Sequence, residues 1–283
     1  MNGKPLEFDF FGLYNGVVTM FDRGSESVWL QVGGRAIRGS MVGAVLKTAP
    51  MTDTTWKKWK QLYPDTLVMS PDTPYVANYT PRGDKLYRGT KKGFPQRYFR
   101  TSLVQGDARM SPWDMVLGVI ITDPNSPKDK PKTTYHCYPL VKLKDAGGVA
   151  QETIQGQEIV AFYDEENDTA VAYSRKVEGK ILTFTLKKES DGTIHYTDKE
   201  TGSVWDFEGR AESGPLKGKA LTRIDGHLSE WYGWAAYFGS TTIYGRTDAP
   251  KPLELLLPEA GGKAPTPEGN KDGSDKPAPP KNP

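Results

Sequence analysis

Two stretches of this 283-residue chain have nearly the same sequence: GRAIRGSMVGAVL at 34–46 and GRAESGPLKGKAL at 209–221. Both fit the pattern G-R-A-x-x-G-x-x-x-G-x-x-L without a gap, at an offset of 175 residues (209 minus 34). A pair of tryptophans three residues apart follows each stretch at the same offset: Trp56 and Trp59, then Trp231 and Trp234. Self-similarity at a fixed period predicts an architecture built from two copies of one structural unit.

The similarity continues upstream with a slip of one residue. An Asp-cation pair followed by Ser-Val-Trp occurs at 22–29 and again at 198–205, an offset of 176 residues (198 minus 22). The motif G-K-x-L-x-F occurs at 3–8 and at 179–184. We therefore expect a mainly β protein of two tandem homologous β-rich repeats, related by pseudo-twofold symmetry, each with one amphipathic Trp-x-x-Trp helix.

The first copy begins partway through its unit. Well-patterned sequence precedes G-K-x-L-x-F in the second copy, but only Met1 and Asn2 precede it in the first. We expect a shortened chain, a gene fragment, or a chain whose start lies further upstream. No charged segment followed by an apolar stretch opens the chain, and no apolar run of about 18 residues occurs, so neither a signal peptide nor a membrane span is predicted.

Composition divides the chain into four predicted parts. They are a first repeat over 1–70, a proline-rich connecting loop region over 71–112, a second repeat over 113–246 and a tail over 247–283. The tail is rich in Pro, Gly, Lys and Asp and is expected to be disordered, because it has too little apolar surface to offset its ordering entropy.

Charge and cysteine content exclude several classes of function. The net charge is +2 with mixed signs throughout, so no nucleic-acid partner is expected. The single cysteine, Cys137, excludes an internal disulfide framework and a multi-thiolate metal site. Aromatic residues make up 11% of the chain, which suits a β fold and equally suits carbohydrate or peptide binding.

Local patterns inside the copies are mostly those of strands. Short β-branched and aromatic runs at 16–22 and 159–163, and alternation over 180–186, predict strands. Asp191-Gly192 lies between two such runs and predicts a hairpin. The acidic segment 164–168 predicts a looser turn between two strands.

Each copy also contains one short helix with an aromatic face. We expect Asp53 or Thr54 to cap the first helix and Ser229 the second. We expect Pro64 and Gly239 to end them. Spacing i, i+3, i+7 places these aromatics on one face of each helix: Trp56, Trp59 and Tyr63, then Trp231, Trp234 and Phe238. Such faces could grip a sugar or peptide, but core packing is the favoured interpretation.

Two shared motifs have a structural and a functional interpretation. Gly34, Gly39 and Gly43 have the spacing of neither a phosphate loop nor a dinucleotide turn, so positive-φ turns and close backbone approach are favoured. Asp22 and Asp198, each beside a cation and before Ser-Val-Trp, could bind a polar ligand, but a turn in which Asp accepts backbone hydrogen bonds is favoured.

No catalytic or metal-binding constellation is recognisable. His136 adjoins Cys137, and neighbours on a strand point to opposite faces, so the two cannot easily share a metal. The run 164–168 fails the calcium-loop pattern, no serine has a G-x-S-x-G setting, and Cys137 is expected to be a small buried hydrophobe. No cofactor and no metal site are predicted.

The duplication ranks the candidate ligand-binding residues. Positions shared by both copies are expected to serve folding, whereas a site is expected where the copies differ or meet. Tyr135, His136 and His195 have no counterpart in the first copy. The predicted site lies at the cleft between the repeats, and its residues are Tyr135, His136, His195, Asp198, Trp205 and Arg210.

These motifs resemble domain-of-unknown-function family 3179. The first copy does so from Asp22-Arg23 through Gly34-x-Ala36 to Trp56-x-x-Trp59 and Pro64, and 200–234 resembles that family's second half. Tyr138-Pro139-Leu140 resembles its A-Y-P-L element, and the similarity covers about residues 3–246. The resemblance implies a bacterial or archaeal protein, often exported and without an established activity, so a periplasmic or secreted location is expected.

The sequence departs from that family at its start. Relatives carry a His-Glu-containing stretch and a Tyr-Cys-Pro-Leu-Cys stretch ahead of the first G-K-x-L-x-F, and both are missing here. In the second copy, 163–167 takes the place of the cysteine stretch. The favoured hypothesis is a non-catalytic protein that binds a small molecule or a protein at the cleft between the copies. The alternatives are a metal- or redox-dependent enzyme whose centre lies in the missing part, and a structural adaptor tethered by its tail.

Overall fold

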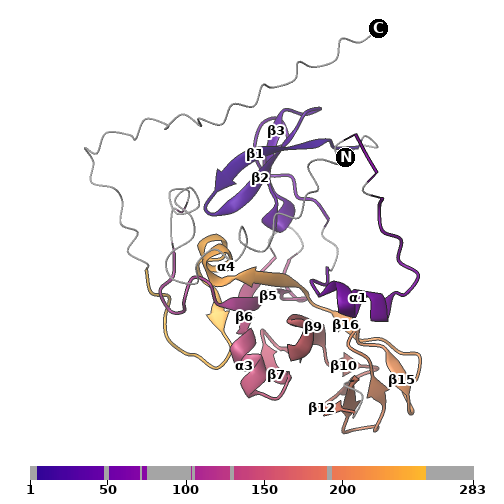
Figure 1. Ribbon diagram of the computed structural model, residues 1–283. Coiled ribbons are helices and arrows are strands. Elements are labelled where there is room, and N and C mark those ends of the chain that lie inside the picture. Colours follow the sequence, from indigo (N-terminus) through magenta and orange to yellow (C-terminus); the bar gives the residue numbers. More distant parts are fainter. Residues whose placement is uncertain are drawn as a thin grey trace.

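The computed structural model describes residues 5–47, 51–70, 72–74, 103, 106–127, 131–189 and 193–252. Within these residues the protein is mainly β, as the sequence predicts, with three short α-helices, of which the one over 140–145 is not among the predicted helices. Most of the predicted connection over 71–112 and of the predicted tail over 247–283 lies outside the described residues. Figure 1 shows the described strands arranged as stacked sheets, with one sheet set apart from the others.

The first sheet carries helix α4 on one face. Its strand order is β17-β5-β6-β18, all antiparallel except the pairing of β18 with β6. The bounds are β5 Met115–Thr122, β6 Thr133–Pro139, β17 Asp225–Glu230, β18 Thr242–Ile243 and α4 Trp231–Tyr237. Helix α4 follows β17 directly and packs its indoles on Val116 and Cys137 of this sheet.

The second sheet is buried on both faces. Its order is β16-β9-β8-β7, with bounds β7 Val149–Ile154, β8 Gln157–Asp164, β9 Thr169–Ser174 and β16 Thr222–Arg223. Helix α3 (Leu140–Asp145) leads into β7, and a short 3-10 turn, η3 (Glu165–Asn167), joins β8 to β9. Along β8, Ile159 and Ala161 face the first sheet while Val160 and Phe162 face the third. The run predicted over 159–163 is therefore a central strand.

The third sheet closes the other side of this core. Its order is β12-β13-β14-β15, with bounds β12 Phe184–Lys188, β13 Ile194–Asp198, β14 Val204–Trp205 and β15 Ala211–Ser213. The strands β12 and β13 form the predicted hairpin, although residues 190–192 at its tip lie outside the described residues. The alternating run 180–186 is divided between β11 (Lys180–Ile181), which pairs with β10 (Lys176–Val177), and β12.

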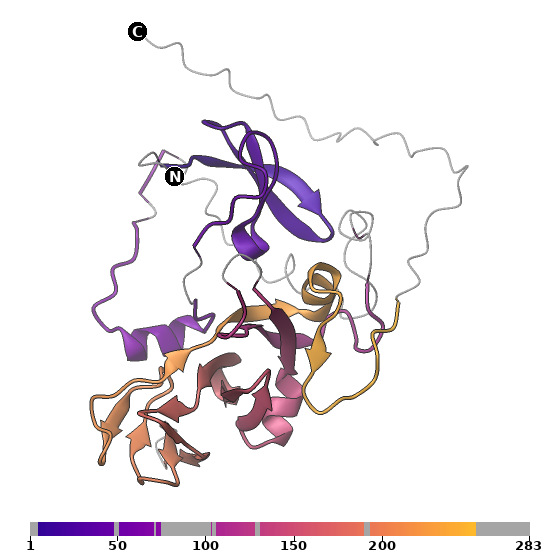
Figure 2. The same ribbon diagram turned by 180° about the vertical axis from the view of Figure 1, so that it is seen from behind.

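The N-terminal sheet lies on the opposite side of α4 from the other sheets, as Figures 1 and 2 both show. Its order is β1-β2-β3-β4, with bounds β1 Phe8–Tyr14, β2 Val17–Asp22, β3 Ser27–Leu30 and β4 Ala36–Arg38, and the 3-10 turn η1 (Val32–Gly34) precedes β4. It meets α4 where the amide of buried Asn15 donates a hydrogen bond to the Ala236 carbonyl.

The N-terminal and third sheets have matching strand registers. These cross-strand partners occur in the two sheets: Phe8 with Asp22, Met20 with Trp29 and Trp29 with Ala36, then Phe184 with Asp198, Tyr196 with Trp205 and Trp205 with Ala211. The rings of Phe8 and Trp29 pack edge to face with their centroids 6.0 Å apart, and those of Phe184 and Trp205 do the same at 5.9 Å.

The shared glycines form tight turns, as predicted. Gly39 has φ 91°, and a Cβ there would lie 2.5 Å from the Glu26 carbonyl oxygen. Gly214 has φ 86°, and a Cβ there would lie 2.6 Å from Ser203 Cα. Both features restrict these positions to glycine, because an L side chain strains the left-handed backbone and collides with the neighbouring strand.

The two aromatic helices differ, which corrects the sequence prediction. Trp231 and Trp234 of α4 are buried, whereas α1 (Trp56–Leu62) buries none of its residues and Trp56 is 50% exposed. The core-packing interpretation is thus right for α4 and wrong for α1. The N-caps also lie one or two residues later than predicted, at Thr55 for α1 and at Glu230 for α4. For α4 the reason is that β17 continues to Glu230.

The imidazole of His227, on β17, should make the free energy of unfolding depend on pH. Burial lowers its pKa below the ordinary value of 6.5, against a smaller opposing effect of Asp225. The unfolded chain therefore binds a proton near pH 6.5 that the folded protein does not yet bind. Stability is full above that pH and falls as the pH drops below it, by at most about 1.4 kcal/mol per pH unit. Urea unfolding at pH 7.5 and 5.5 measures this loss. The variant His227→Gln should reduce it, and an unchanged loss would contradict the assignment.

Candidate functional site

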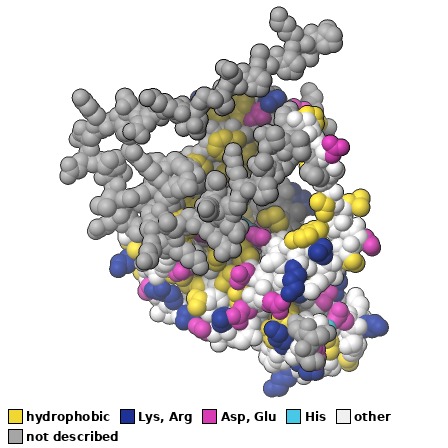
Figure 3. Space-filling view, viewed as in Figure 1, with side chains coloured by type: hydrophobic (Ala, Val, Ile, Leu, Met, Phe, Trp, Pro, Cys, Tyr) yellow, Lys and Arg dark blue, Asp and Glu magenta, His cyan; other side chains and the backbone are white. Residues whose placement is uncertain are grey.

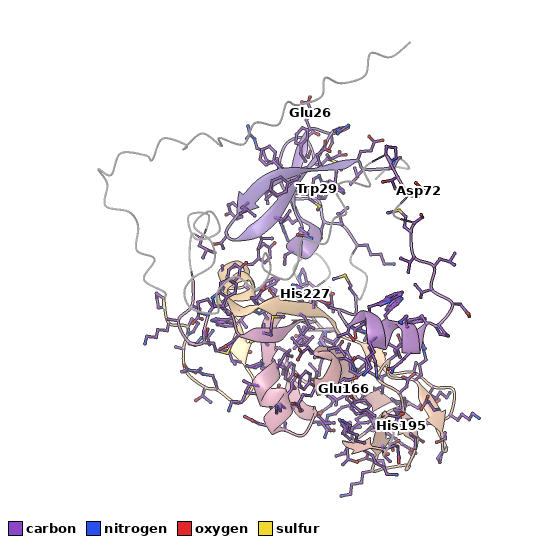
Figure 4. All side chains as sticks on the ribbon, in the orientation of Figure 1. Glu26, Trp29, Asp72, Glu166, His195 and His227 are labelled. Atoms are coloured by element: carbon purple, nitrogen blue, oxygen red, sulfur yellow. The ribbon has the colours of Figure 1, made fainter. Side chains whose placement is uncertain are left out.

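The main candidate site is a cavity of about 440 Å³ beneath helix α1. Helix α1 forms one wall, and η3, β13 and the segment around β14 and β15 form the rest. We call this cavity the α1 pocket; its lining includes Lys58, Gln61, Asp164, His195, Asp206 and Glu212. Figure 4 shows His195 and a further lining residue, Glu166, near each other in the lower half of the molecule.

The N-terminus of α1 is attached to the corner between β8 and β9. The Thr55 hydroxyl accepts a hydrogen bond from the Lys58 amide at 3.2 Å and donates one to Asn167 Oδ1 at 2.8 Å. The Asn167 amide donates to Asp164 Oδ2 at 3.0 Å. Thr169 Oγ1 donates to the Asp53 carbonyl at 2.5 Å. The bonds from Thr55 to Asn167 and from Thr169 to Asp53 join positions more than a hundred residues apart, so they define where α1 sits.

An ion pair lies at the base of the pocket. Lys58 Nζ lies 3.0 Å from Asp164 Oδ2, and the two side chains are 14% and 2% exposed. The second oxygen of this carboxylate, Asp164 Oδ1, is buried and has no hydrogen-bond partner among the described residues. Buried carboxylate oxygens are ordinarily hydrogen-bonded, so an unpartnered one marks a place for a ligand or a water molecule.

The opposite wall is acidic. Glu212 Oε2 lies 3.2 Å from His195 Nδ1. Burial raises the pKa of Asp206 above its ordinary value, although the amide and the charge of Arg210 oppose it in part. The ring of Phe207 lies between the two walls, with Lys58 Nζ 5.9 Å from its centroid.

The rim of the pocket contains a tyrosine–glutamate–arginine cluster. The hydroxyl of Tyr63 donates to Glu208 Oε1, and this bond raises the pKa of Tyr63. Arg210 Nη1 lies 2.6 Å from Glu208 Oε2. Arg210, one of the predicted site residues, therefore lies near the pocket beside the C-terminal end of α1.

Two other predicted site residues lie in the core. Asp198 and Trp205 are both fully buried, and the indole N–H of Trp205 donates to Asp198 Oδ2 at 2.9 Å. Asp198 also accepts from the amides of Thr201 and Ser203 at 2.6 and 3.2 Å. These contacts agree with the turn interpretation, and they place both residues out of reach of a ligand.

Tyr135 and His136 lie at a different place on β6. His136 Nδ1 is 2.7 Å from Thr242 Oγ1, and its Nε2 is 3.0 Å from Glu152 Oε1. A cavity of about 480 Å³ opens in front of this group. Tyr135 points to the opposite face and packs on Phe238 with ring centroids 4.3 Å apart. The six predicted residues are thus divided among three places, and only His195 and Arg210 lie at or near the α1 pocket.

The hydroxyl–imidazole–carboxylate series at His136 resembles a nucleophile with its base and orienting acid. Thr242 Oγ1 also lies 3.4 Å from the Tyr135 carbonyl, and its strand pairs with β6 opposite His136. We therefore infer that Thr242, His136 and Glu152 serve to hold β18 and β7 against β6. Cys137 lies on the other face of that strand, where burial raises the pKa of its thiol well above the usual range.

Apart from His195, sequence reasoning missed the residues that line the α1 pocket. Lys58 belongs to the polar side of a short helix, and Asp164 to a segment identified only as an acidic turn. No local signal joins them, because they are far apart in the chain. The single usable clue was the inference that a site would lie where the two halves of the sequence meet.

The chain belongs to a family described as "Protein of unknown function (DUF3179)", whose model matches residues 1–241. This agrees with the resemblance found in the repeated motifs. No curated protein and no solved structure matches the chain. Among the described residues, no group of three or more His, Cys, Asp or Glu side chains is placed to hold a metal ion. None of the described helices combines the length and apolar character needed to cross a membrane.

Proposed function

We propose that this protein binds a small polar molecule in the α1 pocket. The observation that carries the proposal is Asp164, whose buried Oδ1 has no partner among the described residues although the side chain lines an open cavity. Leaving a buried carboxylate oxygen without a donor costs about 1–3 kcal/mol or more. A ligand that supplies a donor recovers that free energy on binding.

We also propose that the pocket lies between two copies of one unit. The matching registers of the N-terminal and third sheets support this. So do the matching indole bonds, from Trp59 to Thr66 at 2.9 Å and from Trp234 to Thr241 at 3.0 Å. In this view α1 is the helix of the first copy, resting on the second. A crystal structure in which residues 8–46 and 184–221 could not be superposed would contradict it.

Blocking the pocket should weaken binding. In the variant Gln61→Trp an indole would occupy the space next to the lining side chains of α1. A polar small-molecule library, screened by thermal shift and followed by calorimetry, should yield a ligand of the wild type whose affinity falls at least about tenfold in this variant. The matched control is Lys60→Trp, which adds the same indole at an exposed position of the same helix.

This test has two contradicting outcomes. A ligand that binds Gln61→Trp as tightly as the wild type would place the binding site elsewhere. A library that shifts the melting temperature with none of its members would contradict binding itself.

We further propose, from the family resemblance alone, that the protein acts outside the cytoplasm, and cell fractionation with an antibody to the natural protein tests this.

A further inference from the structure

We propose that the ligand of the α1 pocket carries an organic cation, an ammonium or guanidinium group, which binds between Asp206 and Glu212. This inference rests on the proposed function and specifies its ligand class. Three observations support it: the pocket has more carboxylates than cations, one oxygen of Asp164 has no partner among the described residues, and the lining includes apolar side chains.

The pocket has more carboxylates than cations. Its acidic lining residues are Asp164, Glu166, Asp206 and Glu212, and its basic ones are Lys57 and Lys58. Both lysines are already paired: Lys57 Nζ lies 2.7 Å from Glu166 Oε1, and Lys58 Nζ lies 3.0 Å from Asp164. Asp206 and Glu212 therefore remain without a lysine partner in the pocket.

The environment of these two carboxylates favours an incoming positive charge. Glu212 Oε2 lies 3.2 Å from His195 Nδ1, and Asp206 accepts the Arg210 amide at 2.8 Å. Burial raises the pKa of Asp206, the amide and the positive charge of Arg210 oppose this shift in part, and Glu208 and Glu212 add to it to a smaller extent, so the net shift is upward. A cation placed between the carboxylates would relieve this repulsion.

An organic cation fits better than a metal ion. The described carboxylates do not converge into a group of three that could coordinate a metal. The lining of the pocket also includes Phe207 and Ile194, which can contact the apolar part of an amine or the face of a guanidinium. Asp164, whose Oδ1 has no hydrogen-bond partner among the described residues, belongs to the same lining.

Figure 3 shows acidic and basic side chains interspersed over the described surface on the face that it displays. Cations should therefore bind only weakly to this surface outside the pocket. A variant with the same change in net charge outside the pocket measures that non-specific binding.

The experiment is calorimetric titration of the full chain with argininamide and spermidine as cationic probes, glucose as a neutral probe and citrate as an anionic one. The cationic probes should bind, and affinity should fall at least about tenfold in Asp206→Asn/Glu212→Gln. Both substitutions preserve shape, and the amide introduced by Asp206→Asn would retain an oxygen to accept the Arg210 amide. The charge-matched control is Asp9→Asn/Glu178→Gln, because these carboxylates pair with Arg23 and Lys219 outside the pocket. Should the pocket double variant unfold, Glu212→Gln alone should lower the affinity about threefold or more.

The outcomes distinguish a failure of this inference from a failure of the proposed function. Binding of the neutral or anionic probe instead of the cations, abolished by Gln61→Trp, would overturn the cation assignment and leave the pocket as the site. Equal loss of affinity in the pocket variant and the charge-matched control would overturn it by showing a non-specific effect. The absence of binding by every probe, together with no hit from the polar library, would contradict both.

Discussion

Replacing Gly118 by alanine is expected to destabilise the protein by about 3 kcal/mol or more, a large part of the total stability of a domain. Gly118 lies in the middle of β5, where a Cβ would stand 2.2 Å from two ring carbons of Trp234. The indole cannot move aside easily, because it is 1% exposed and its N–H donates to Thr241 Oγ1 at 3.0 Å. Urea unfolding followed by circular dichroism measures the change.

The matched control for Gly118→Ala is Gly233→Ala in the adjoining helix. A Cβ on Gly233 would meet only Ser229 Oγ at 3.4 Å, which is ordinary van der Waals contact. Alanine in a helix interior is more favourable than glycine by about 0.5–1 kcal/mol, so this variant should be as stable as the wild type or more so. If both substitutions lowered the unfolding midpoint equally, the close approach of α4 to β5 would not be the cause.

Replacing Lys58 by methionine is expected to cost about 3 kcal/mol and to release α1 from the β8–β9 corner. The substitution leaves the Asp164 carboxylate buried with only the Asn167 amide as a donor. Removing one partner of a buried ion pair is strongly destabilising, because the remaining charge has lost its solvation and its counter-ion. Urea unfolding gives the free energy, and limited proteolysis around α1 reports the release of the helix.

A second variant distinguishes an uncompensated charge from lost packing. In Lys58→Met/Asp164→Asn the buried charge is gone, so most of the stability should return. Lys57→Met serves as the exposed control, because Lys57 and Glu166 are 68% and 47% exposed and screened by water, and no measurable change is expected. Equal destabilisation in the single and double variants would contradict the charge argument.

Several features of the fold were predictable because they are local. The G-x-x-x-x-G-x-x-x-G spacing identified turn glycines, and Gly39 and Gly214 both have positive φ and closely approach a neighbouring strand. The Asp191-Gly192 signal identified the pairing of β12 with β13. The residues that make these contacts are near in sequence, so their backbone preferences appear directly in the pattern.

The burial of the two aromatic helices could not be predicted from their local sequence. The same aromatic spacing occurs in α1 and α4, but α4 lies on the first sheet and is buried, whereas Trp56 is half exposed. The helical pattern specifies which side chains share a face and not what covers that face. For the same reason Asp198 and Trp205 look like ligand-binding groups in the sequence, although the structure buries them as partners of each other.

The sequence by itself determined the class of fold, the turn positions, the family and the absence of a recognisable catalytic motif, because each depends on residue types at short spacing. Only the tertiary structure decided where α1 rests, which lysine pairs with Asp164, and that His136 and His195 belong to separate places. The contacts of Thr55 with Asn167, of Lys58 with Asp164 and of His136 with Thr242 all join residues more than a hundred positions apart. Such contacts are selected by the packing of whole sheets, and no local preference encodes them.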